Sequence, residues 1–157
     1  KVVDKLPEYD VTAVFNVTNT AEPTALCHSG MTSAFTEMYV DGVQVNVTSG
    51  YTFSTFGEHT VNYMLKNNTI LTGSSFSGLF TNCTSLEEIE FVSGLEKIYS
   101  DAFAECSSLV ELNLPEGIKT LSTYVFDGCV SLEEIFIPST VETFGIYSMF
   151  EWYNKIE

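Results

Sequence analysis

The sequence contains no arginine, and its six basic residues are lysines set against 21 acidic residues, giving a formal net charge of −15 at pH 7. Fourteen acidic residues and three lysines lie after residue 75, so the second half carries most of the negative charge. An acidic chain without guanidinium groups is a poor partner for nucleic acid or for an anionic membrane. The simplest role of this charge is to keep a solvated surface soluble.

Long apolar runs are also missing. No stretch approaches the ~18–20 apolar residues that cross a bilayer as a helix, so we expect no membrane-spanning segment. A hydrophobic content of 45% nevertheless favours a folded chain, and 157 residues suffice for one domain or two small ones. The chain begins KVVDKL without methionine, so we expect a mature or trimmed fragment whose signal peptide or lipid anchor lies outside it.

The sequence contains one pattern that is repeated three times from Phe80 onward. The copies FTNCTSLEEIEFVSGLEKIYSDA, FAECSSLVELNLPEGIKTLSTYV and FDGCVSLEEIFIPSTVETFGIYS align without a gap at a spacing of 23 residues. A fixed period of about 20–29 residues around an LxxLxL core predicts a leucine-rich repeat solenoid. The columns include Phe80, Phe103 and Phe126, continued by Met149; Cys83, Cys106 and Cys129; Leu86, Leu109 and Leu132; and Ile89, Leu112 and Ile135.

One such coil is too small to fold alone, because its apolar side chains need the faces of neighbouring coils to be buried. Three coils are close to the minimum, so both ends of the stack need caps. At the C-terminal end the pattern fails, with Trp152 where the column has cysteine and Lys155 where it has leucine. We therefore expect residues 71–157 to be three full repeats followed by a degenerate C-terminal cap, or a piece cut from a longer array.

The repeat resembles the BspA-like leucine-rich repeats, through CTSLEEIEF, CSSLVELNLP, CVSLEEIFIP and the DAF before Cys106. The departures are mild: Val92 replaces the usual proline in the first copy, and Phe144-Gly145 stands for Ile-Gly. The resemblance implies an extracellular or surface-attached protein of the kind abundant in Bacteroides-type bacteria and some protists. It also implies a role in adhesion.

Residues 9–66 alternate apolar and polar positions in five or six short runs separated by turn residues, which predicts strands and no helix. The clearest hairpin is EMYVDGVQVNV, where Asp41-Gly42 suits a type I′ turn. We expect a small antiparallel β-sandwich of immunoglobulin-like character over residues 1–70, placed to cap the solenoid. Its segment GEHTVNYML resembles the domain that precedes the repeats in BspA-like proteins. Residues 1–8 are expected as a loose lead-in, 67–75 as a junction, and Phe76 under the first coil.

The candidate site is the row of strand positions that alternate away from the solenoid core. A ladder of Glu88, Glu111 and Glu134 at a rise of ~4.8 Å costs only about 1 kcal/mol per pair in water, so it needs no cation. The ladder is either an unliganded acidic strip or a site for a basic partner or a divalent cation. The full set of predicted partner-binding residues is Glu88, Glu90, Glu111, Asn113, Glu134 and Phe136.

Signals for catalysis and for metal binding are weak. Cys27 and His28 are adjacent, so a strand would point them to opposite faces, and His59 is distant and alone. No zinc-ligand spacing or dense calcium loop occurs, and a ladder of equivalent carboxylates offers no distinct acid and base. We expect no cofactor, no metal, no catalytic residue and four buried free thiols that pack as apolar groups.

Two surface features stay open. Asn16, Asn46, Asn67 and Asn82 lie in N-x-Ser/Thr sequons, which are chance in a bacterium and glycosylation sites in a protist. Tyr124 and Tyr147 share a column, with Tyr99 two positions off it, and either stack on sugar rings or fill space under the coil.

The sequence thus favours a mainly β, non-enzymatic module of a cell-surface or secreted protein. We expect its solenoid face to bind a host or microbial extracellular protein. The alternatives are a structural spacer or cap within a longer surface array, and a carbohydrate-binding accessory.

Overall fold

The computed structural model describes residues 9–66, 78–91 and 95–147. Its elements are almost all strands, which confirms the mainly β class. The N-terminal part contains β1 (Val11–Val17), β2 (Thr24–Ala25), the 3₁₀ helix η1 (Ser29–Ala34), β3 (Phe35–Val40), β4 (Val43–Val45), β5 (Gly50–Tyr51) and β6 (Gly57–Leu65). The repeats contribute β7 (Leu86–Phe91), β8 (Lys97–Ile98), β9 (Glu111–Asn113), β10 (Thr120–Leu121), β11 (Glu134–Phe136) and β12 (Thr143–Phe144).

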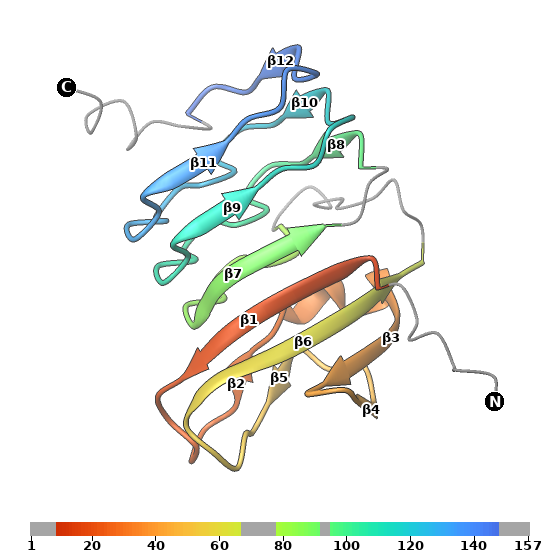
Figure 1. The fold of residues 1–157 in the computed structure, drawn as a ribbon, viewed down its shortest axis with the longest axis vertical. Coiled ribbons are helices and arrows are strands. Elements are labelled where there is room, and N and C mark those ends of the chain that lie inside the picture. Colours follow the sequence, from red (N-terminus) through yellow and green to blue (C-terminus); the bar gives the residue numbers. More distant parts are fainter. Residues whose placement is uncertain (1–8, 67–77, 92–94, 148–157) are drawn as a thin grey trace, which may run out of the picture.

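One seven-stranded sheet runs through both parts of the chain in the order β11-β9-β7-β1-β6-β3-β4 (Figure 1). The repeat strands β7, β9 and β11 are parallel, and Glu88 pairs with Glu111, which pairs with Glu134, so residues 23 apart lie side by side. β1 pairs antiparallel with β7 on one side and with β6 on the other. The edge of the first repeat strand is therefore covered by the N-terminal part, where the sequence predicts a cap.

A second wall closes each coil. The short strands β8, β10 and β12 form a parallel three-stranded sheet, and the buried columns pack between it and β7, β9 and β11. The rings of Phe80, Phe103 and Phe126 stack at centroid distances of 5.8 and 5.9 Å. Each coil is thus held to the next by a continuous core and by main-chain ladders on both walls.

The cysteines behave as predicted, since all four are free and buried. The thiol of Cys106 donates to the carbonyl oxygen of Phe80, and that of Cys129 to the carbonyl oxygen of Phe103, each at 3.1 Å. These thiol bonds add to the main-chain bonds that the same carbonyl oxygens already accept from the amides of Cys83 and Cys106, so each thiol also ties its coil to the preceding one.

The N-terminal part differs from the expectation in two respects. Residues Ser29–Ala34 form a 3₁₀ helix, although no helix was expected, because the His28 ring accepts a hydrogen bond from the amide of Gly30 and caps it. Of the strands described between residues 9 and 66, four (β1, β3, β4 and β6) belong to the large sheet. Only β2 and β5 form a separate ladder. The immunoglobulin-like sandwich is therefore not confirmed.

The predicted hairpin is present, with β3 and β4 paired across Asp41-Gly42 at φ values of 48° and 79°. Positive φ at both central residues is what a type I′ turn requires. Several expectations lie outside the described residues: the lead-in 1–8, the junction 67–75 with Phe76, and the positions Val92, Met149, Trp152 and Lys155. Within the described parts, no helix is long and apolar enough to span a membrane.

Candidate functional site

The six predicted partner-binding residues all lie on one side of the large sheet, which we call the open face. Along β7 the buried Leu86, Ile89 and Phe91 point into the core, while Glu88 and Glu90 are exposed. The same alternation exposes Glu111 and Asn113 on β9, and Glu134 and Phe136 on β11. Phe136 is 60% exposed although it is aromatic, so the open face has an apolar group on its edge strand β11.

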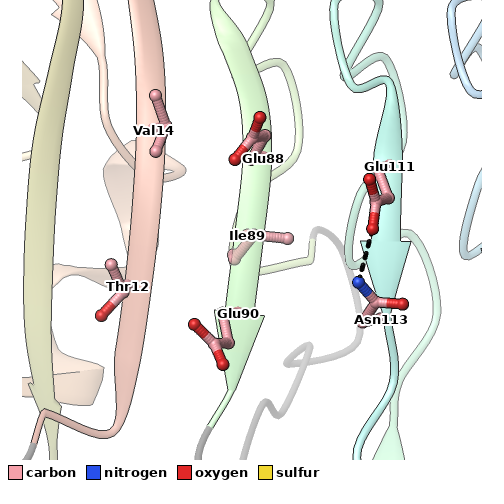
Figure 2. A pocket seen from close by; sticks show the side chains of 7 residues that line it. All are labelled: Thr12, Val14, Glu88, Ile89, Glu90, Glu111 and Asn113. Carbon is pink, nitrogen blue, oxygen red and sulfur yellow. Dashed lines mark hydrogen bonds between the residues drawn. The ribbon is translucent and has the colours of Figure 1, made fainter.

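Strand register sets these side chains in two rows that cross the strands. One row contains Glu134, Glu111 and Glu88, and the other contains Phe136, Asn113 and Glu90. The amide of Asn113 donates to Oε1 of Glu111 at 2.7 Å, which holds that carboxylate against its own strand (Figure 2). The carboxylates of Glu88 and Glu90 have no hydrogen-bond donor among the described residues.

The rows continue into the N-terminal part. On β1, Val14 lies opposite Glu88 and Thr12 lies opposite Glu90. Together the three strands surround a hollow of about 290 Å³, lined by Thr12, Val14, Glu88, Ile89, Glu90, Glu111 and Asn113 (Figure 2). The sequence did not single out Thr12 and Val14. The alternation in YDVTAVFNV places both on one face of a strand, but it does not indicate that this strand pairs with β7.

The charge on the open face is of one sign where it crosses the repeats. Four carboxylates project from β7, β9 and β11, and no lysine does so among the described residues. Lys97 and Lys119 belong instead to the opposite wall, where Lys119 lies 3.7 Å from Glu96. A basic group approaching this face would therefore meet no competing cation from the described chain.

A side-chain contact fastens β1 to the first repeat strand. The Asn16 amide nitrogen donates to Oε1 of Glu87 at 2.8 Å. Asn16 is one of the four sequon asparagines, and its amide is occupied by this bond. Asn46 and Asn82 are exposed, and Asn67 lies outside the described residues.

The residues considered for catalysis do not form a nucleophile with a base. Burial raises the pKa of the Cys27 thiol to about 12, which leaves it protonated and unreactive at neutral pH. Cys27 and His28 follow β2 rather than lying in it, and the Nδ1 atom of His28 accepts the Gly30 amide. The described residues contain no group of three or more histidine, cysteine or acidic side chains that would hold a metal ion.

His59 is held in place by Asp41, Thr55 and Phe53. Its Nδ1 lies 2.7 Å from Oδ2 of Asp41, and its Nε2 lies 3.0 Å from the carbonyl oxygen and 3.2 Å from Oγ1 of Thr55. The ring also packs on Phe53 at a centroid distance of 4.3 Å. Because Nε2 is as close to a main-chain oxygen as to the hydroxyl, the histidine ties two loops together rather than activating Thr55.

The tyrosine column is on the surface. The rings of Tyr124 and Tyr147 stack at 5.4 Å with an interplanar angle of 12°, and the residues are 41% and 45% exposed. They do not fill the space under the coil, which the phenylalanine column occupies, whereas Tyr99 is half-buried.

Stacked coils joined by parallel ladders on two walls, with an open sheet face on one of them, define a leucine-rich repeat protein. The family model of the BspA type leucine rich repeat region matches residues 74–157 in six copies. The chain belongs to the BspA-type leucine-rich repeat family, since this match covers just over half of it. No curated protein and no solved structure matches the chain.

Proposed function

We propose that this chain is a non-catalytic binding module of a surface-attached or secreted protein, and that its open face holds an extracellular protein of a host or a neighbouring microbe. The observation that carries the proposal is the row of Glu88, Glu111 and Glu134 on three parallel strands, from which no lysine projects among the described residues. Charge complementarity of this kind selects partners and speeds their association. The proposal keeps residues 1–70 and 71–157 as the two domains of the module.

The test is a charge reversal with a matched control. Glu88, Glu111 and Glu134 are changed to Lys, and retention of the chain on immobilised extracellular matrix proteins is measured. The control changes Glu22, Glu116 and Glu142 to Lys; these exposed residues lie off the open face, and the net charge changes equally. We expect about tenfold weaker retention for the open-face variant and less than about a twofold change for the control.

Equal retention of the two variants would show that the open face does not hold the partner. If the wild-type chain shows no saturable retention on any matrix protein, it would instead be a spacer within a longer surface array.

The stacked Tyr124 and Tyr147 favour one second candidate, a carbohydrate-binding accessory. Exposed aromatic rings are suitable platforms for the apolar faces of sugars. Binding of a soluble glycan that is lost in Tyr124→Ala, and kept in the open-face charge reversal, would favour this candidate.

A further inference from the structure

We infer that strand β1 is part of the binding face, and that the face takes an extended cationic polypeptide segment which seats a lysine or arginine side chain between β1 and β7. This inference rests on the proposed function and names the chemistry of its partner. It extends the site beyond residues 74–157, the part that matches the repeat family.

The large sheet continues without a break from the repeats into the N-terminal part. The row that contains Asn113 and Glu90 continues through strand pairing to Thr12 on β1. From there it continues to Asn62 on β6 and Tyr39 on β3. Asn62 is only 7% exposed and donates from Nδ2 to Oγ1 of Thr12 at 2.9 Å. That bond directs the hydroxyl proton of Thr12 away from Asn62, so Thr12 keeps a donor for an incoming group.

The hollow is bordered by side chains of unequal length on β1 and β7. Thr12 and Val14 are short side chains facing the longer Glu90 and Glu88 across the β1–β7 ladder, so the surface drops at β1. Its volume of about 290 Å³ lies at the lower limit of the range of ~300–1,000 Å³ for enclosed small-molecule sites. The hollow therefore suits one long side chain of a polypeptide.

The lining of the hollow combines acidic and apolar side chains. Carboxylates of Glu88, Glu90 and Glu111 surround the hollow, and the methyl groups of Val14 form an apolar wall beside them. A lysine or arginine side chain matches both, because its methylene stem packs on apolar surface while its charged end reaches the carboxylates. An acidic or purely apolar side chain would leave the carboxylates of Glu88 and Glu90 without a partner.

The rows of the open face also indicate the direction of a bound segment. The two rows cross the strands, so a segment that follows them from β11 to β1 passes over four strands at a spacing of ~4.8 Å, or roughly 14 Å. An extended chain covers that distance in about five residues at ~3.3 Å each. Basic residues at alternate positions of such a segment would point toward the sheet together.

The test uses a fluorescein-labelled decapeptide of alternating lysine and threonine, titrated against the full chain by fluorescence anisotropy. Val14→Phe fills the hollow without changing the charge, and we expect it to weaken binding about tenfold. Val43→Phe is the matched control, since Val43 is exposed on the edge strand β4 and pairs with the buried Val40, outside both rows of the open face, and it should alter binding less than about twofold. Val14→Lys, which places a cation beside Glu88, is a second variant with the same expected loss. The thermal midpoints of all variants are compared first to establish folding.

The outcomes separate this inference from the proposed function. If the charge reversal at Glu88, Glu111 and Glu134 weakens peptide binding while both Val14 variants bind as wild type, the repeat face stands and the role of β1 is overturned. If neither the charge reversal nor the Val14 variants weaken it, both proposals fail. Equal weakening by Val14→Phe and Val43→Phe would also overturn the assignment of the hollow.

Discussion

Each coil has a turn at which one residue adopts a left-handed backbone conformation, and Asp101 is one of these residues. It has a left-handed backbone with φ of 59°, and Tyr124 and Tyr147 repeat that conformation at 55° and 60° in the same column. Aspartate and asparagine tolerate this region better than most residues. Partial burial raises the pKa of Asp101, and the nearby Asp127 carboxylate raises it further. The charged form of Asp101 is therefore less favourable in the folded chain than in the unfolded one.

Asp101→Asn should raise the free energy of unfolding at pH 7, because asparagine keeps the left-handed turn and removes the poorly solvated charge. Because the pKa of Asp101 is raised in the folded chain, its side chain disfavours folding when ionised but not when protonated. The stability advantage of Asp101→Asn over wild type should therefore disappear below the ordinary aspartate pKa of 3.8. Urea unfolding at pH 7 and at about pH 3 measures it. The control variant Glu116→Gln removes an exposed loop charge and is unfolded under the same two conditions. An Asp101→Asn variant less stable than wild type at pH 7 would contradict the assignment.

At the scale of elements, the β3–β4 hairpin is fixed by its turn and by a contact with β6. Asp41 has φ of 48°, accepts the Thr60 amide on Oδ1 at 3.0 Å, and holds His59 through Oδ2 at 2.7 Å. The turn thereby joins β3, β6 and the loop that carries Thr55. The Asp-Gly pair predicted the turn, but nothing in the sequence near His59 predicted this partner.

Asp41→Ala should destabilise the chain by about 2 kcal/mol, because it removes two hydrogen bonds and places alanine in a left-handed turn. Asp41→Asn keeps the turn geometry and an oxygen acceptor, so the loss should be about 1 kcal/mol. Chemical denaturation of both variants, fitted with a shared slope, gives the two values. Wild-type stability in Asp41→Ala would show that the contact with His59 is not a structural tie.

The repeat strands and their outward residues could be predicted because the information is local and periodic. Glu88, Glu111 and Glu134 follow from a fixed period and from alternation, and the structure places them in one row. The pairing of β1 with β7 joins segments about 70 residues apart, and no local pattern specifies which strand edges meet. Thr12 and Val14 therefore entered the site only through the tertiary structure.

At the scale of the whole molecule, one sheet and one core join the N-terminal part to the repeats. Main-chain bonds link His28 to Leu79 and Asn16 to Ser85, each at 2.9 Å. The ring of Tyr63 packs on Phe80 at a centroid distance of 5.7 Å. The repeats and the N-terminal strands are thus held together by main-chain bonds and by ring packing across their junction.

A chain reduced to residues 78–157 should lack a cooperative unfolding transition, because removal of β1 leaves the edge of β7 unpaired and uncovers Leu79 and Phe80. Circular dichroism during heating compares it with the full chain. A truncated chain that melts cooperatively at the same midpoint would show that the repeats need no N-terminal cap.

The open face as a binding surface for cationic segments is tested most directly by nuclear magnetic resonance. The full chain, labelled with nitrogen-15, is titrated with the alternating lysine–threonine decapeptide, and amide shifts are followed residue by residue. Saturable shifts should concentrate at Thr12–Val14, Glu88–Glu90 and Glu111–Asn113. The amides of β8 and β10, on the opposite wall, should remain unchanged. Shifts centred on that opposite wall, or no saturable shift at any residue, would contradict the account.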